Sequence, residues 1–149
     1  MLLALLVTAH AAAAAPAGKA AETATSAGRH RPCASVVVGS PQALPGRSSF
    51  SVTKILDLEL RAHTRPLPAG PHLVELKLYT PRGHLYEVLP VALEATRSKK
   101  ASRRHAVARL PVAGTSIVAA SLFGRWRVDV HLDGAPQSCG IPTHFRLTP

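Results

Sequence analysis

The chain has 149 residues, which is enough for one domain but not for two domains of ordinary size. Lysine and arginine outnumber aspartate and glutamate by 18 to 8, so the formal charge is +10 and favours anionic partners. Hydrophobic residues make up 46% of the chain, but aromatic residues only 4%, which excludes a core built mainly from large rings.

Residues 1–20 are predicted to be a secretory signal peptide. Residues 1–7 form an apolar run, and a series of small residues, mostly alanine, follows it. This run is too short to span a bilayer, and no lysine or arginine precedes it. We therefore expect an exported protein that is secreted, periplasmic or at the cell surface, with no transmembrane span in the mature chain.

Residues 21–31 are rich in small polar residues and alanine, which predicts a flexible leader, and 32–149 is the expected folded domain. Two cysteines, Cys33 and Cys139, stand near the ends of that domain. Two cysteines in an exported chain predict one disulfide. Closing so long a loop is expected to stabilise the fold by about 4–5 kcal/mol. The alternative is a pair of free thiols.

The elements expected in chain order are short strands with a two-residue period of apolar residues. They cover 34–38, 50–62, 73–80, a returning strand after 84, 105–112, 124–132 and a last segment through Phe145 and Leu147. In the second strand Leu56, Leu58, Leu60 and Ala62 are expected on the buried face. Residues 116–122 fit either a short helical turn or a strand.

A hairpin turn is expected over 80–84, with Pro81 at its first central position and Gly83 in a left-handed conformation. Thr80 would then pair with His84. Continuing this register places Lys77 opposite Glu87, an unlike-charge pair, which we take as support for it.

The run from Gly124 to Gly134 shows the strictest alternation in the chain. One face is apolar: Trp126, Val128, Val130 and Leu132. The other is polar: Arg125, Arg127, Asp129 and His131. We expect this strand to pair with the last one, so that Asp129 faces His144 or Arg146.

Seven or eight short strands without a long amphipathic helix predict an all-β, antiparallel, immunoglobulin-like sandwich, with a small barrel as the alternative. The segments 78–86, 110–115, 122–128 and 132–134 resemble uncharacterised secreted bacterial immunoglobulin-like domains. That resemblance implies the sandwich fold and an extracytoplasmic location. It transfers no catalytic residue, and the chain departs from antibody domains because its cysteines lie at the domain ends.

No motif for catalysis is found. The chain lacks a Gly-x-Ser-x-Gly elbow, a His-x-His pair and a glycine-rich phosphate loop that leads into a helix. We therefore expect no enzymatic activity and no cofactor. The only candidates for a metal site, and weak ones, are His131, His144 and Asp129.

The densest basic segment lies between two strands and contains Arg97, Lys99, Lys100, Arg103 and Arg104. Such a cluster can bind polyanions by counterion release, but a plain solvated loop between strands is the favoured explanation. Because no aromatic residue is interspersed, nucleic acid is disfavoured as a partner. The predicted function is a non-catalytic structural or protein-binding module of the cell envelope, with an unknown envelope protein as partner. The alternative is a surface polyanion-binding protein that uses 97–105.

Overall fold

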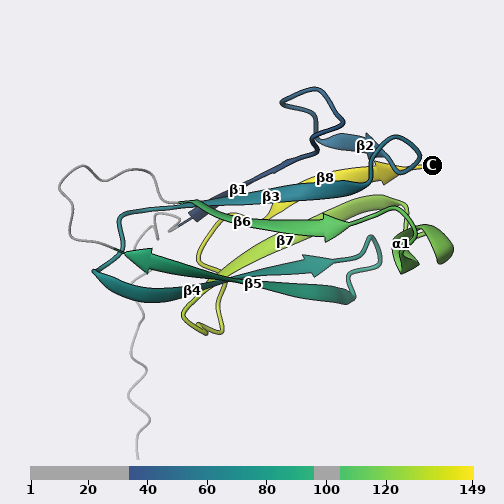
Figure 1. Cartoon of the computed structure of the whole chain (residues 1–149). Helices are drawn as coiled ribbons and strands as arrows, with labels where there is room; N and C mark the ends of the chain where they lie inside the picture. The colour runs from purple at the N-terminus through teal and green to yellow at the C-terminus, as the bar shows by residue number, and fades with distance from the viewer. Residues whose placement is uncertain (1–33, 96–104) are drawn as a thin grey trace, which may run out of the picture. The chain divides into compact units, whose positions relative to one another are not determined.

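The computed structural model describes residues 34–95 and 105–149, which form eight strands and one short helix (Figure 1). The strands are β1 (Ala34–Gly39), β2 (Ser49–Ser51), β3 (Asp57–Thr64), β4 (Gly70–Tyr79), β5 (Leu85–Ala95), β6 (His105–Pro111), β7 (Gly124–Leu132) and β8 (Thr143–Thr148), and the helix is α1 (Ser116–Ala119). The domain is therefore all-β, as predicted. The expected signal peptide and leader, Cys33, and the five basic residues of the segment 97–105 lie outside the described residues.

The strands form two sheets, one of three strands in the order β1-β3-β6 and one of five in the order β2-β8-β7-β4-β5. The five-stranded sheet curves from β4 and β5 at the lower edge of the view to β8 and β2 at the upper edge (Figure 1). One pairing corrects the antiparallel prediction, because β2 runs parallel to β8. This pairing places Phe50 opposite Leu147, where both side chains are buried.

The core lies between the two sheets, and both contribute side chains that are removed from water. The three-stranded sheet supplies Leu58, Leu60, Ala62, Ala106 and Leu110, and the five-stranded sheet supplies Val74, Leu76, Leu78, Trp126, Val128, Phe145 and Leu147. These are the faces that the alternation predicts. Trp126 is fully buried in this core. Its indole N–H donates to the Leu122 carbonyl oxygen at 2.9 Å, and its rings contact Tyr86 edge-on and stack on Phe145.

Leu56 is a local exception to the predicted core, because its side chain is 66% exposed. The chain turns after β2, where the Lys54 N–H donates to the Ser51 carbonyl oxygen, and β3 begins only at Asp57. Within the turn Val52 and Ile55 reach the core instead. The single long strand predicted over 50–62 is therefore two strands with a turn between them.

The 80–84 turn is confirmed, but the predicted register beyond it is wrong. Thr80 pairs with His84, and Gly83 has a φ of 83°. The register then shifts by one residue, so that Lys77 lies opposite Val88 rather than Glu87. Tyr86 is the extra residue of this β-bulge. The shift lets Tyr86 pack on Trp126 while Leu89, Val91 and Leu93 also pack against the core.

Of the two alternatives left open for residues 116–122, the helical turn is present as α1. Thr115 caps it, because its hydroxyl accepts from the Ile117 N–H at 3.3 Å. The Tyr86 and Ser116 hydroxyl oxygens lie 2.8 Å apart and connect β5 to this turn. Among the described residues there is no helix with the length and apolarity needed to cross a membrane.

His131 was expected on the wet face of β7 but is buried, with 5% of its surface exposed. The loop after β7 folds back over it, because the Ala135 carbonyl oxygen accepts from His131 Nδ1 at 2.8 Å. The Cys139 N–H also donates to the Val130 carbonyl oxygen, at 2.8 Å. The side chains of β7 therefore point alternately to the two faces of the sheet, as predicted, but at the end of the strand His131 is buried although it lies on the outer face.

A histidine–carboxylate pair holds the start of β4 against the turn that follows β7. His72 Nδ1 lies 2.8 Å from Asp133 Oδ2, and Asp133 Oδ1 accepts from the Leu73 N–H. His72 Nε2 faces the Pro68 carbonyl oxygen at 2.9 Å. Because both ring nitrogens face acceptors, the pKa of His72 is raised, with the Asp133 hydrogen bond as the main cause.

The residues that follow the two cysteines lie side by side. Ala34 and Gly140 form an isolated parallel bridge, and a Cβ atom added to Gly140 would meet the Ala34 carbonyl oxygen at 2.5 Å. A glycine is therefore required here for space. The Cys33–Cys139 disulfide stays a prediction because Cys33 lies outside the described residues, but the close approach of Ala34 and Gly140 is consistent with it.

We predict that Gly140→Ala lowers the free energy of unfolding by about 1–3 kcal/mol, the usual range for overpacking, measured by urea denaturation. Gly39→Ala is the matched control, because a Cβ atom there meets no atom within 4 Å. Equal stability of the two variants would show that the 34–140 contact is not as tight as described.

Candidate anion-binding site

Four basic or titratable side chains of β7 and β8 share the outer face of the five-stranded sheet. Arg125 lies directly opposite Arg146, and Arg127 lies directly opposite His144. The residues between them, Trp126 and Phe145, point into the core. We call this set, Arg125, Arg127, His144 and Arg146, the arginine face. It exists because burial of Trp126 forces its neighbours in sequence outward.

The hairpin turn after β4 forms a wall beside the arginine face. A hollow of about 250 Å³ is lined by Tyr79, Thr80, Pro81, Gly83, Arg125, Arg127 and His144. Gly124 allows this approach, because a Cβ atom there would meet Pro81 Cβ at 3.0 Å and its φ is 130°. The lining contains two arginines and a histidine but no carboxylate.

Arg127 is held in place by an aromatic ring and a carboxylate. Its Cζ lies 4.1 Å from the centroid of the Tyr79 ring, a cation–π contact. Its Nε lies 3.3 Å from Asp129 Oδ1, on the side away from Arg125 along the strand. The Nε–H is not aligned for a hydrogen bond, since both atoms are buried without a hydrogen-bond partner. The guanidinium is thus positioned, and within the described residues its terminal N–H groups have no hydrogen-bond partner.

The arginines of the two sheets differ in how they are neutralised. On the outer face of the three-stranded sheet, Arg61 pairs with Glu59, and Arg109 lies 4.0 Å from Asp57. Within the described part of the chain, the Arg125 and Arg146 side chains have no ion-pair partner, although they lie opposite each other. Like charges placed directly opposite on adjacent strands are destabilising. A bound anion would remove this repulsion.

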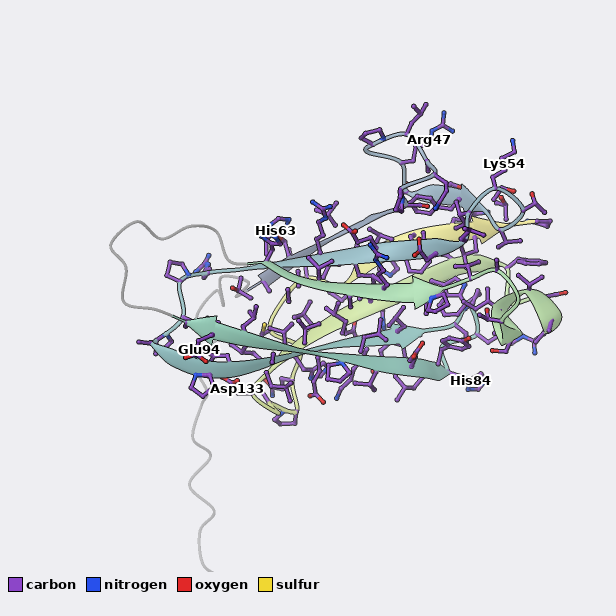
Figure 2. All side chains as sticks on the ribbon, in the orientation of Figure 1. Arg47, Lys54, His63, His84, Glu94 and Asp133 are labelled. Carbon is purple, nitrogen blue, oxygen red and sulfur yellow. The ribbon has the colours of Figure 1, made fainter. Side chains whose placement is uncertain are left out.

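Two acidic groups, Glu94 and Asp133, lie at the end of the five-stranded sheet that is remote from the hairpin turn. Figure 2 shows Glu94 and Asp133 at the left of the view and His84, in the hairpin turn, at the right. Asp129 is the one carboxylate on β7 itself. We call the end of the sheet beside the 80–84 turn and the arginine face the basic end; it also holds two carboxylates, Glu87 opposite Leu78 and Asp129 opposite Lys77.

Unsatisfied polar atoms also concentrate at the basic end. Four buried side-chain oxygen or nitrogen atoms lack a hydrogen bond in the described residues, and three of them belong to Thr80, Arg127 and Asp129. Native proteins satisfy most buried polar groups, so such a group calls for an explanation. The cluster of three such atoms is consistent with a site whose hydrogen bonds are completed by a bound partner or by water.

His144 responds electrostatically to this environment. Partial removal of its ring from water lowers its pKa below the usual range, and the Arg125 and Arg127 guanidinium groups lower it further. Asp129 offsets this only in part, since it raises the pKa of His144. These surroundings therefore favour the neutral ring, which can both donate and accept a hydrogen bond.

The three metal candidates are not brought together. His144 lies opposite Arg127, four residues from His131 along β7, which separates the histidines by about 13 Å at about 3.3 Å per residue. His131 is bonded to the loop, and Asp129 lies beside Arg127. Within the described ranges no group of three His, Cys, Asp or Glu residues could hold a metal ion.

Sequence reasoning found part of this site. It placed Arg125 and Arg127 on the outer face of β7, where the structure has them. The predicted pairing of Asp129 with His144 or Arg146 is wrong, because Asp129 lies opposite Lys77 of β4. Sequence reasoning also missed the wall formed by Tyr79 and the hairpin turn. The strict alternation on β7 and β8 was the available signal, but the register between them had to be known to group the arginines.

A second hollow, of about 430 Å³, lies on the other sheet. Its lining comes from the end of β1, the loop 40–46 and two residues of β3, and it includes Val37 and Leu44. Both of these side chains are more than half exposed. This hollow is mainly apolar, whereas the one at the arginine face is cationic.

No family model and no curated protein matches the chain. A solved structure that resembles it is the Pseudomonas fluorescens alkylpurine DNA glycosylase AlkC bound to DNA containing an abasic site analog. The match has a TM-score of 0.41 and 15% sequence identity, and covers 76% of this chain and 30% of that chain. The chain thus spans less than a third of the length of this neighbour.

This neighbour contradicts two expectations from the sequence. The chain was expected not to be an enzyme, and nucleic acid was disfavoured as a partner, whereas the neighbour is an enzyme bound to DNA. Both expectations are withdrawn. A likeness at this TM-score carries no argument for glycosylase chemistry in the present chain, and none is built on it.

We predict that NMR titration of the ring protons finds the pKa of His144 below the usual value of about 6.5. Arg125→Gln should raise this pKa toward the usual value, because one of the two cations that oppose protonation is removed. Arg61→Gln, on the other sheet, is the control and should leave the titration unchanged. A wild-type pKa at or above the usual value would contradict the described surroundings of His144.

Proposed function

We propose that this chain is an exported binding domain that takes an anionic partner on the arginine face. The observation that carries the proposal is the pairing of Arg125 with Arg146 beside a hollow that has no carboxylate in its lining. Two cations that lie opposite each other without an anionic partner repel each other, so a bound anion stabilises them more than it would stabilise cations that are already paired. The polyanion is thus bound at β7 and β8, and not only by the basic segment 97–105.

The scaffold in this proposal is an immunoglobulin-like sandwich. Two sheets enclose one core, β7 carries a buried Trp126, and the strand number agrees with the predicted seven or eight. The signal-like N-terminus supports export, and an exported cationic domain meets the sulfated or phosphorylated polymers of cell surfaces.

Binding to an envelope protein is the second candidate, and the apolar hollow on the three-stranded sheet favours it. Val37, Leu44 and Val107 are exposed on or beside that face, and such side chains bury surface when a protein partner docks. The two functions use opposite faces of the domain, so one experiment separates them.

The test is retention on immobilised heparin as a function of salt. Arg125→Gln, Arg127→Gln and Arg146→Gln combined should lower the salt at elution, because each lost contact removes roughly 0.7–0.9 from the slope of log K against log salt. We expect the slope to fall by about 2–3 in total.

The matched control changes Arg61, Arg65 and Arg109 to Gln. It removes the same net charge, and Arg61 and Arg109 lie on the other sheet. If the two triple variants elute at the same salt, retention follows net charge and the arginine face is not the site. A third variant with Arg97, Lys99, Lys100, Arg103 and Arg104 changed to Gln measures the contribution of the basic segment.

A further inference from the structure

The hollow beside the arginine face has the size and donors for a single charged group. Its volume of about 250 Å³ is far more than the space that one water molecule needs. A tetrahedral ion with some of its hydration fits that space. If the partner is a long polymer, one of its charged groups therefore binds in the hollow and the remainder of the polymer lies along the protein surface.

The donors that face this hollow are arranged before any ligand binds. Tyr79 and Asp129 fix the Arg127 guanidinium plane, and this leaves its terminal N–H groups for an oxyanion. Arg125 lines the same hollow from two residues earlier on β7. Two guanidinium groups and a histidine match the several acceptor oxygens of a sulfate or phosphate group.

His144 connects this site to pH. The charged groups that act on its ring are Arg125, Arg127 and Asp129 from β7. Tyr79 of β4 lines the same hollow, and Arg146 lies two residues further along β8. On the other side of β8, β2 has no charged residue. The two arginines oppose protonation of the ring. An anion in the hollow offsets their charge and attracts a proton to His144.

We propose that the hollow binds one tetrahedral oxyanion, the sulfate or phosphate group of the anionic partner, and that binding is coupled to proton uptake by His144. This inference rests on the proposed function and deepens it by naming the group recognised. Because His144 is more protonated in the bound state than in the free state, affinity rises as the pH falls through the pKa of His144. At higher pH, where the ring is neutral in both states, the affinity levels off.

The two sources of the oxyanion differ in their own titration. A sulfate group keeps its charge throughout this range, so its affinity rises continuously as the pH falls. A phosphate monoester loses its second charge near pH 6, which opposes the gain at His144 and produces a maximum in affinity. The shape of the pH profile therefore identifies the group.

The test uses the full chain with inorganic sulfate or phosphate as the probe, at constant ionic strength set with sodium chloride. NMR titration follows His144 with and without the probe. We expect saturating sulfate to raise the pKa of His144 by about one unit, which corresponds to tenfold tighter binding to the protonated form. Arg127→Gln should abolish this increase, and Arg61→Gln should preserve it.

The outcomes separate this inference from the proposed function. If neither sulfate nor phosphate changes the pKa of His144, the inference is wrong. If heparin retention nevertheless depends on the arginine face, the proposed function is still supported. His144→Gln offers a second check that does not alter either arginine. It should retain sulfate binding at pH 7 but lose the gain at lower pH; an unaltered pH profile would also overturn the proton coupling.

Discussion

The burial of Trp126 near the start of β7 is the constraint on which the rest of the structure depends. Its indole N–H bonds to Leu122, and its rings contact Tyr86 and Phe145, so β7 is fixed both to the segment before it and to β5 and β8. A slip of one residue would expose this side chain and turn Arg125 and Arg127 into the core. The same contact that holds the core together therefore also determines which charges reach the surface.

Alternation alone was sufficient to predict most strands and the inward residues of β3, β4 and β7. It failed where a distant segment decides the outcome. The register of β5 depends on a bulge at Tyr86 that lets both Tyr86 and Leu89 face the core, and cross-strand charge pairing could not reveal it. His131 is buried by a loop that folds back, and β2 joins β8 in parallel across nearly a hundred residues. Each is a tertiary effect without a local signal.

The candidate site shows the same division. The outward direction of Arg125 and Arg127 follows from their place beside Trp126, but their grouping with His144, Arg146 and the hairpin turn follows from pairings across three strands. The two sheets treat their arginines differently, since the three-stranded sheet pairs them with carboxylates and the five-stranded sheet places two of them opposite each other. Stability alone does not favour the second arrangement, whereas anion binding does.

The most direct test of this account is a map of backbone amide chemical shifts on titration with a short sulfated oligosaccharide. We expect the largest changes to cluster at residues 79–83, 125–127 and 144–146, with β1, β3 and β6 unaffected. Changes centred on the apolar hollow around Val37 and Leu44, or an even spread over all lysines and arginines, would contradict it.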